Sequence, residues 1–349
     1  MLAHYLRTTG LFHGSERLNV TPWASVRPFM PEDAEALGAA LAKRNRFARH
    51  RGRDDFYTSK ADDFAVQTVV ELMIPGVPPT PPAEARQIAD RVERLLIAAT
   101  THWLTRRKLH SIMGIANIGR GVRDLYIGPG ATRLSTRGLE VWTGDGLVTD
   151  AEFRRRWERT GLSAVAPAIL RPRGFIPERV DRALAWLNES RLDHHAEAAL
   201  IKAVIGLENL FVQDKNEPLA RTISDRLAFV LGRTAAERAA LARVALHLYD
   251  LRSRIVHGGS RPKESIDDAV DVASFLLLLS AHALIARAGE MQSKDDVRRW
   301  VEDMRWAVGS REVAPLPFST RHVHRVLRRG NSLTDPQRTA RKARPSVWA

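Results

Sequence analysis

The stretch YDLRSRIVHGG, residues 249–259, carries an arginine and a histidine at the end of a predicted helix. Histidine exchanges protons near neutral pH, and arginine binds phosphate through a fixed fork of N–H donors. Arg252 and His257 therefore have the residue types of a metal-independent ribonuclease, which needs an acid or base and a fixed cation. A basic last turn followed by glycine is also an ordinary helix ending, so this spacing leaves both interpretations open.

The angular positions of Arg252 and His257 on one helix do not favour joint action. Five positions separate the two residues, which places them about 140° apart around the helix axis. Arg252 borders the apolar stripe of the helix, so its stem can pack while its head reaches a groove. His257 lies in the last turn, where the helix dipole favours a charged imidazole. A shared phosphate would require a distorted last turn or a second copy of the helix.

A carboxylate on an earlier predicted helix is the third candidate. Glu208 interrupts an apolar stripe formed by Ile201, Ile205 and Val212. A carboxylate on an apolar face needs a partner, and Arg252 is the one we expect. The pair would either position Arg252 for catalysis or fix helix packing as a structural ion pair. Neighbouring residues that would either support this site or be ordinary boundary residues are Ser253, Asn209 and Tyr249.

Three sequence blocks around these residues resemble a known family. In order they are ALIKAVIGLENLFV, RLAFVLG and LYDLRSRIVHGG, and together they are similar to the Apea-like branch of the HEPN superfamily. That family is marked by an arginine, four to six intervening residues and a histidine, often with a polar residue directly after the arginine. Arg252, Ser253 and His257 fit this pattern. The resemblance covers about 178–290, roughly a third of the chain.

The resemblance implies a helical bundle that forms a homodimer in which two motifs face each other, which would resolve the angular problem. It implies an endoribonuclease or RNA-binding protein of a toxin, abortive-infection, phage-defence or stress system, with Arg252, His257 and Glu208 as site residues. Some members are inactive and bind a nucleotide, RNA or protein instead. A non-catalytic module that dimerises and binds a nucleotide or protein partner is therefore the alternative. Residues 1–165 lack the signature of the nucleotidyltransferase that accompanies some members, so such a partner would be a separate protein.

Composition excludes several kinds of chemistry. The chain has no cysteine, which rules out disulfides, zinc–thiolate sites, iron–sulfur clusters and cysteine nucleophiles and fits a reducing cytoplasm. The N-terminus lacks the apolar core of a signal peptide, so export is not expected. The histidines at 194–195 lack carboxylates at ligand spacing, which favours solvent exposure over a metal site, and any metal affinity of the histidines at 322–324, in the basic tail, would be incidental. The glycines at 119–121 and 128–130 lack a dinucleotide-binding pattern. We expect no metal and no cofactor.

Basic residues gather at the two ends of the chain. Lys and Arg outnumber Asp and Glu by 54 to 40; residues 191–290 hold 13 of each sign, whereas 321–349 hold 8 basic residues and 1 acidic residue. An anionic partner such as RNA would first meet the basic ends of the chain. Alternatively, the excess of arginine reflects a general enrichment of arginine in the proteome and no binding function. Another basic cluster lies at 43–53 near the N-terminal end. Its arginines would either contact the RNA backbone or form a solvated charged face; they are Arg44, Arg46, Arg49, Arg51 and Arg53.

The expected architecture is α+β. Residues 1–165 predict a mixed α and β domain, and a proline-bearing hinge follows at 166–180. Helices are expected at 178–191, 193–212, 217–232, 234–259 and 265–289, forming a HEPN-type bundle of four to five helices over 178–290. A helical extension covers 291–330, and a basic tail at 331–349 is expected to be disordered. The apolar run at 269–286 contains Asp271 and His282, which favours a buried core helix over a membrane span.

Overall fold

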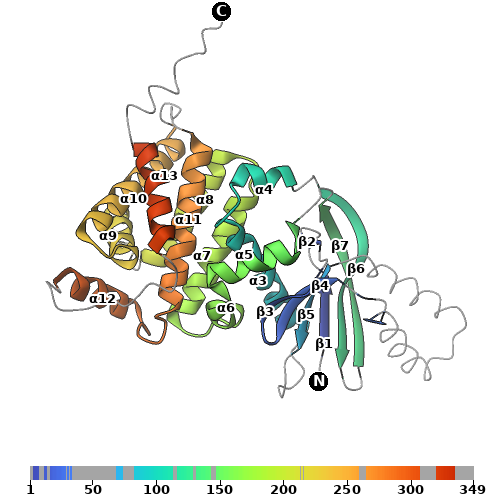
Figure 1. Ribbon diagram of the computed structural model, residues 1–349. Helices are drawn as coiled ribbons and strands as arrows, with labels where there is room; N and C mark the ends of the chain where they lie inside the picture. Colours follow the sequence, from blue (N-terminus) through green and yellow to red (C-terminus); the bar gives the residue numbers. More distant parts are fainter. Residues whose placement is uncertain are drawn as a thin grey trace, which may run out of the picture. The chain divides into compact units, whose positions relative to one another are not determined.

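The chain divides into two compact units, seen in a computed structural model (Figure 1). The sheet unit comprises Met1–Glu93 and Lys108–Arg159, and the helical unit comprises Arg94–Arg107 and Thr160–Ala349. The structure describes residues 3–7, 12–13, 16–28, 30, 32–33, 68–73, 82–112, 116–128, 131–142, 147–212, 214, 216–258, 265–306 and 320–334. The fold is α+β, as the sequence predicts, with most of the described residues in helices.

The sheet unit is built on a six-stranded antiparallel sheet with the order β3-β4-β5-β1-β6-β7. A separate parallel pair joins β2 to β8. The strands are β1 (Ala3–Arg7), β2 (Phe12–His13), β3 (Leu18–Thr21), β4 (Ala24–Pro28), β5 (Thr68–Met73), β6 (Ala116–Gly128), β7 (Ala131–Trp142) and β8 (Leu147–Val148). Three helices accompany them in sequence, α3 (Pro82–Thr100), α4 (Arg106–Ile112) and α5 (Ala151–Thr160). The strands predicted between 108 and 150 are therefore present.

A buried charged group links β4 to β5. Glu71 lies opposite Ser25 in the strand register and is only 4% exposed. Its carboxylate accepts hydrogen bonds from the Ser25 hydroxyl at 3.2 Å and from Arg27 Nη2 at 3.0 Å. Arg27 also donates to Asp33 Oδ1 at 2.8 Å, and Asp33 holds the pKa of Arg27 above its usual range against the effect of burial. These bonds compensate the burial of charge, so the group stabilises the strand pairing.

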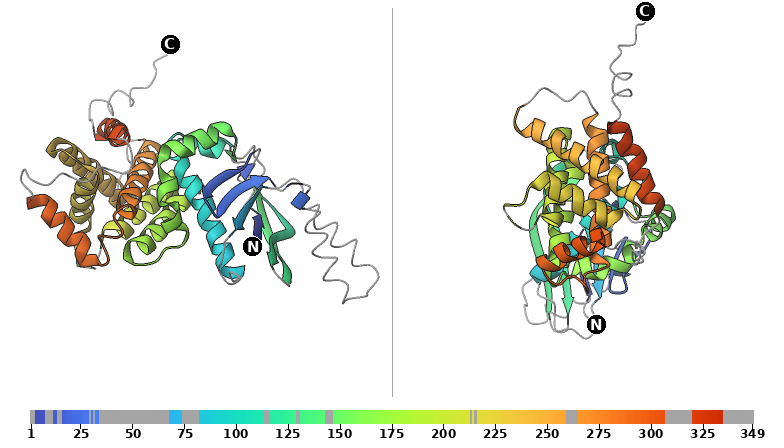
Figure 2. Two further views of the ribbon diagram at one scale, coloured as in Figure 1. Left: turned by 60° about the horizontal axis from the view of Figure 1, so that its bottom comes forward. Right: turned by 90° about the vertical axis from the view of Figure 1, so that its left-hand side faces the viewer.

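The helical unit is organised around α11 (Ile266–Ile285), whose residues from Ala269 to Ile285 are all buried. Its neighbours are α6 (Leu162–Leu170), α7 (Phe175–Leu192), α8 (Ala196–Phe211), α9 (Leu219–Leu231), α10 (Ala235–Val256) and α13 (Thr320–Thr334), while α12 (Lys294–Trp306) packs on α9. Figure 2 shows these helices from two further sides. By length and composition α11 could cross a membrane, with a mean hydropathy of 1.7 over 18 residues, but 94% of that window is buried among the other helices.

The ends of α10 follow from local sequence signals. The Thr234 hydroxyl accepts a hydrogen bond from the Glu237 backbone N–H at 3.1 Å, and the Glu237 carboxylate accepts one from the Thr234 N–H at 3.3 Å. This capping box satisfies two backbone donors that the first helical turn leaves free. At the other end, Gly258 takes a φ of +67°, a left-handed conformation that ends a helix readily only at glycine. Both signals were predicted, and both are confirmed.

The proline-bearing segment 166–180, predicted as a hinge, joins two helices. Most of it is helical: α6 extends to Leu170, and α7 begins at Phe175. Pro177 is the third residue of α7, where its missing N–H costs no helical hydrogen bond. Pro167 lies inside α6, which is short and tolerates the loss of one such bond. The two prolines thus lie within helices, because the effect of a proline depends on its position within a helical turn.

The helix α13 also extends beyond the expected boundary. It continues to Thr334, past residue 331, where the disordered tail was predicted to begin. Residues 335–349 lie outside the described residues. The inner face of α13 buries Val323, Val326, Leu327 and Leu333, and its contacts are with α10 and α11. An apolar stripe at helical spacing thus fixes a segment whose overall composition is polar and basic.

Gly330 allows the close approach of α13 to α10. A Cβ atom at this position would lie 2.5 Å from Val244 Cγ2, too close for any real contact. Because a valine side chain cannot rotate away freely, we expect Gly330→Ala to lower the free energy of unfolding by about 1–3 kcal/mol. The measurement is thermal or denaturant unfolding of the full chain. In the Gly330→Ala/Val244→Ala variant the combined loss should be smaller than the sum of the two single losses, and strict additivity would contradict this contact.

Candidate functional site

The helices α8 and α10 bring Glu208 and Arg252 together. Glu208 lies in the last turn of α8 and Arg252 in the last turns of α10, and these two helices contact each other in the bundle. Arg252 Nη2 is 3.8 Å from Glu208 Oε1, and the two side chains are 22% and 20% exposed. The separation is that of an ion pair without a direct hydrogen bond. Glu208 therefore has the partner that its position on an apolar face predicts.

The electrostatics of this pair reflect partial burial. Burial raises the pKa of Glu208, and the nearby Arg252 guanidinium opposes that rise. Within the described part of the chain, Glu208 Oε1 and Arg252 Nε are buried without a hydrogen-bond partner. The part of the Arg252 side chain that remains exposed, 22%, can still meet a further anion, and the phosphate of a nucleic acid suits the geometry of a guanidinium.

Tyr249 and Asn209 occupy different surroundings. The Arg252 guanidinium carbon lies 5.8 Å from the centre of the Tyr249 ring, close enough for a cation–π contact. Burial and the Glu208 carboxylate raise the pKa of the Tyr249 hydroxyl. The Asn209 side-chain amide instead donates to the Ile205 carbonyl at 3.0 Å. Tyr249 is thus the supporting residue that contacts Arg252, while the amide of Asn209 is used within its own helix.

Two arginines, the half-buried Arg179 and the buried Arg226, fix the end of α8 next to Glu208. Arg179 Nη1 donates to the carbonyls of Asn209 at 2.8 Å and Val212 at 2.9 Å. Arg226 donates to the Phe211 carbonyl and to Glu217, with its Nη2 at 2.7 Å from Glu217 Oε1. These guanidinium groups satisfy carbonyls that the last helical turn leaves without partners. The backbone that carries Glu208 is therefore held from two sides.

His257 lies apart from this pair. It is the C-terminal cap of α10, its side chain is exposed, and its backbone N–H donates to the Ser253 carbonyl at 3.0 Å. Among the described residues, no hydrogen bond or ion pair joins the His257 side chain to Arg252 or Glu208. Ser253 is half-buried one position beyond Arg252. One chain thus brings Glu208, Arg252 and Tyr249 together but leaves His257 outside their contacts, consistent with the angle expected from the helix.

The outer face of α10 around His257 is partly apolar. Leu246 and Val256 are 45% and 47% exposed, which is high for residues of this kind. At 100° per residue, the half-buried Ser253 shares this face with Leu246 and His257. Val256 is ten residues from Leu246 and about 80° away around the helix, so the two exposed side chains are separate and do not form one apolar patch. His257 is exposed on the same side of the helix as Leu246.

Other predicted contacts are not placed. Arg44, Arg46, Arg49, Arg51 and Arg53 lie outside the described residues. Within the described residues there is no group of three or more His, Asp or Glu side chains arranged to hold a metal ion.

Comparisons with known proteins add no assignment. No protein-family model, curated protein or solved structure matches this chain. The chemistry and placement of the side chains are therefore what indicates a function.

Two polar clusters in the helical unit were not predicted. In one, the fully buried Arg191 of α7 donates from Nη1 to Asp271 of α11 at 3.1 Å, and Arg106 donates its backbone N–H to the same carboxylate at 2.8 Å. Asp271 itself was visible in the sequence as a charge within an apolar run. A charge within an apolar run indicates that a buried residue of opposite charge lies next to it. The sequence of the run does not show which arginine that residue is.

The second cluster consists of three histidines from separate elements. The ring of His102, in the turn after α3, lies 4.7 Å from the ring of His322 on α13 and 5.1 Å from the ring of Phe275 on α11. His282 of α11 is the third member. Burial lowers the pKa of His102 to about 3 and that of His282 to about 4. Repulsion by the positive charge of a protonated His322 lowers both pKa values further. The three residues are far apart in the sequence, so no local pattern could have predicted their meeting.

Proposed function

We propose that the helical unit is a HEPN-type domain and that the protein is a cytoplasmic, metal-independent endoribonuclease that acts as a homodimer, in a defence or stress response. The observation that carries this proposal is the Glu208–Arg252 pair at 3.8 Å, held between α8 and α10 near the end of the helix that bears His257. The Arg252 side chain is 22% exposed, so part of its guanidinium is open to a phosphate. A cation so placed can stabilise the charge that develops on a phosphate during cleavage.

In this proposal, each subunit supplies one histidine to a shared site. His257 of one subunit takes the proton of the RNA 2′-hydroxyl, whose oxygen then bonds to the adjacent phosphorus. The bond from phosphorus to the 5′ oxygen breaks, and that oxygen takes a proton from His257 of the other subunit. The products are a 2′,3′-cyclic phosphate and a 5′-hydroxyl, so DNA is not cut. The dimer also accounts for the exposed position of His257, which contacts neither Arg252 nor Glu208 within one chain.

The decisive experiment compares RNA cleavage by wild-type protein and by His257→Ala in the presence of EDTA. Loss of a general acid or base lowers such a rate by about 100-fold or more, and we expect a loss of that size. The matched control is His195→Ala, which removes another exposed histidine at a helix end. Equal cleavage by wild-type and His257→Ala protein, or cleavage that requires a divalent metal, would contradict the proposal.

A non-catalytic interaction module is the second candidate. It is favoured by the exposed Leu246 and Val256 on the same helix as His257, since aliphatic side chains suit a protein partner better than RNA. Under this function the bundle dimerises and binds a nucleotide or a protein, and Glu208 with Arg252 fixes the packing of α8 and α10. Wild-type protein without RNA cleavage, together with a stable dimer, would support this candidate over the nuclease.

A further inference from the structure

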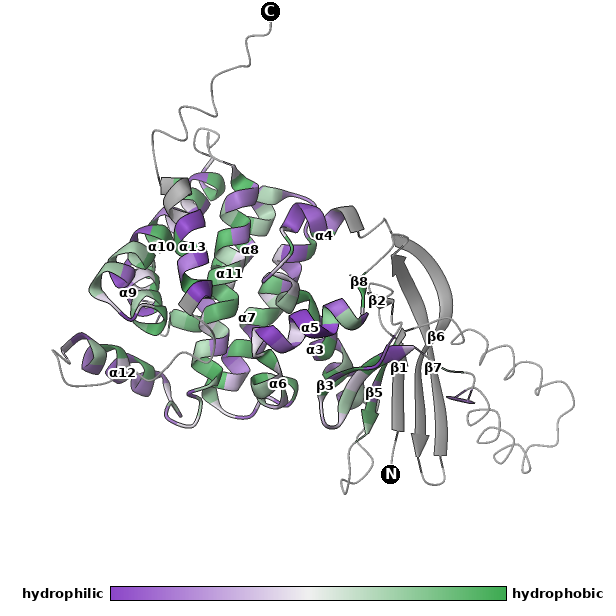
Figure 3. Ribbon diagram, in the orientation of Figure 1, coloured by the Kyte–Doolittle hydropathy of each residue, from purple (hydrophilic) through white to green (hydrophobic). Residues whose placement is uncertain are grey.

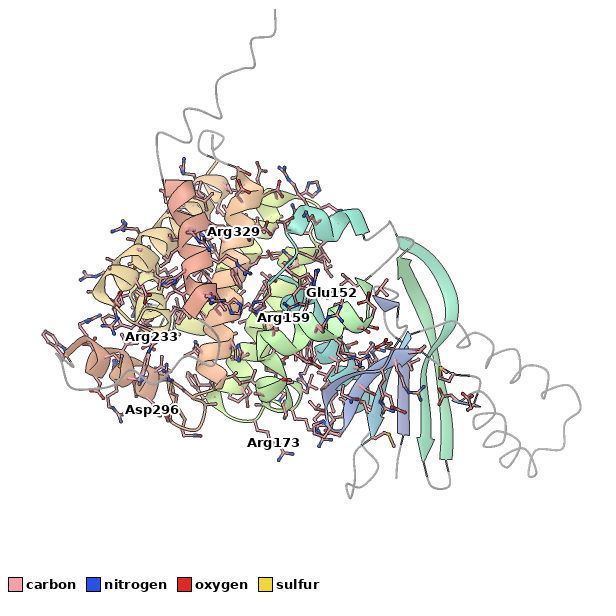
Figure 4. The ribbon with its side chains drawn as sticks, in the orientation of Figure 1. Glu152, Arg159, Arg173, Arg233, Asp296 and Arg329 are labelled. Carbon is pink, nitrogen blue, oxygen red and sulfur yellow. The ribbon has the colours of Figure 1, made fainter. Side chains whose placement is uncertain are left out.

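The helix α13 contacts the bundle through one face. Its buried apolar residues pack on α10 and α11, while Figure 3 colours much of its visible side as hydrophilic. Arg329, labelled in Figure 4, acts through its charge on Asp271 of α11. His324 Nε2 lies 3.0 Å from Glu237 of α10, but the His324 side chain is 56% exposed, and a pair in solvent contributes little. A terminal helix docked through one face can detach while the other helices stay folded.

The side chain of His102 is covered by this helix. His102 is 8% exposed and lies in the turn that follows α3. Within the described residues, neither of its ring nitrogens has a hydrogen-bond partner. Its ring centre lies 5.1 Å from that of Phe275 on α11 and 4.7 Å from that of His322 on α13. Its backbone carbonyl accepts a hydrogen bond from Arg325 of α13 at 2.9 Å. His102 is thus enclosed by groups that leave only when α13 leaves.

The groups around His102 oppose a positive charge on its ring. The side chains whose charge acts on it are His322 and Arg325 from α13 and His282 from α11, and all three are basic. Burial, together with these neighbours, lowers the pKa of His102 to about 3, so the ring is neutral while α13 is docked. When α13 detaches, water reaches the ring, and its pKa returns toward the ordinary value for histidine, about 6.5.

Proton uptake therefore favours the detached form below about pH 6.5, because only that form binds a proton at His102. At pH 5.5 this one histidine shifts the equilibrium toward detachment by about 10-fold, and at pH 7.5 it has almost no effect. Burial and Arg325 also lower the pKa of His322. Exposure of His322 on detachment thus acts in the same direction.

We propose that α13 is an acid-released cover of the bundle and that His102 is the residue that senses protons. At neutral pH α13 lies over α10 and α11, with Gly330 against Val244. Acidification increases the detached fraction and uncovers the apolar surface around Val244 while the helices beneath stay folded. The uncovered helix α10 also bears Arg252 and His257, but the release does not depend on RNA cleavage.

Introduced thiols can report the release, because the chain has no cysteine. Val326 of α13 and Val180 of α7 are both 0% exposed. The thiol of Val326→Cys reacts when α13 detaches, whereas that of Val180→Cys reacts only when the bundle itself opens. Both full-length variants are labelled with 4,4′-dithiodipyridine, which reacts with thiols at acid pH, at pH 7.5 and pH 5.5. Each rate is divided by that of the same variant unfolded in denaturant.

We expect Val326→Cys to react faster than Val180→Cys at both pH values, and its corrected rate to rise by about 10-fold or more between pH 7.5 and pH 5.5. His102→Gln, added to the Val326→Cys chain, removes the residue that takes up the proton, so the rise should become about 10-fold smaller. The matched control is His195→Gln in the same chain. It replaces an exposed histidine and should keep the full rise.

Three results would overturn the proposal. Equal rates at the two thiols would mean that α13 detaches only when the whole bundle opens. A rise that His102→Gln leaves unchanged would exclude His102 as the sensor, and the absence of any rise would exclude release by acid. If His102→Gln does not fold, as judged by circular dichroism, the comparison of the two thiols in chains that keep His102 still decides whether acid releases α13.

Discussion

Asp271→Ala should destabilise the helical unit by about 3–5 kcal/mol, an effect as large as the loss of a well-packed core side chain. Asp271 lies on α11 within the core and is 8% exposed. Its carboxylate compensates Arg191, which is fully buried, and also accepts the Arg106 backbone N–H. Removal of the carboxylate would leave the Arg191 guanidinium with its Nη2 bond to the Leu104 carbonyl but without its counter-ion.

Thermal unfolding of the full chain, followed by helical circular dichroism, measures this loss. For a unit of this size we expect the melting temperature to fall by roughly 10 °C. The control is Asp295→Ala, which breaks an exposed pair with Arg298 and should cost less than about 1 kcal/mol. In Arg191→Met/Asp271→Leu both charges are absent, so stability should recover in part. A double variant as unstable as Asp271→Ala would show that buried charge is not the cause.

Acidification from pH 7.5 to pH 5.5 should destabilise the same unit through its buried histidines. The pKa of His102 is lowered to about 3 and that of His282 to about 4, chiefly because burial disfavours the charged imidazole. The groups that face them, His322 for both and Arg325 for His102, are basic, and they add to this effect. In the unfolded chain both histidines return to a pKa of about 6.5.

The direction of the change in stability with pH follows from the difference in proton uptake between the folded and unfolded states. Below pH 6.5 the unfolded state binds protons that the folded state does not, so stability falls as the pH falls toward the folded-state values. At pH 5.5 each histidine contributes a loss of about 1.4 kcal/mol, or about 3 kcal/mol for the two. Burial raises the pKa of Asp271, which acts in the opposite direction at acid pH. The difference between variant and wild-type protein isolates the histidine contribution.

The measurement is therefore the change in melting temperature between pH 7.5 and pH 5.5 for wild-type protein and for His282→Gln. The variant cannot take up a proton at this position, so its loss of stability should be smaller by the contribution of one histidine, about 1.4 kcal/mol. His195→Gln, at an exposed position, should match the wild type. If the pH dependence of His282→Gln is the same as that of wild-type protein, titration of this cluster does not control stability.

Local signals in the sequence predicted the helices of the bundle. The partner of Glu208 was predicted because a carboxylate interrupts an otherwise apolar stripe. The capping box at Thr234 and the glycine stop at Gly258 set the ends of α10, because these bonds form within a few residues. A carboxylate on an apolar stripe requires a cation, and Arg252 was the cation at the border of the next stripe. The roles of Arg252, His257 and Glu208 in catalysis remain predictions.

The features that the sequence did not predict depend on tertiary packing. The helix α13 has a polar, arginine-rich composition, and its stability comes from four apolar residues that only the bundle covers. His322 and His324 lie two residues apart in a basic segment, yet the rotation of α13 turns one toward His102 and the other toward Glu237. Composition averages over both faces of a helix, so it could not separate them.

The order in which the two units can form during synthesis follows from how the chain divides. Residues Arg94–Arg107 interrupt the sheet unit in sequence but belong to the helical unit. They carry His102 and Arg106, whose partners on α11 and α13 emerge from the ribosome more than 150 residues later. A fragment that begins at Thr160 lacks both residues, so neither unit can be released by a single cut. Folding of the helical unit must then wait for nearly the whole chain, and an early segment stays in contact with solvent or chaperones until α11 arrives.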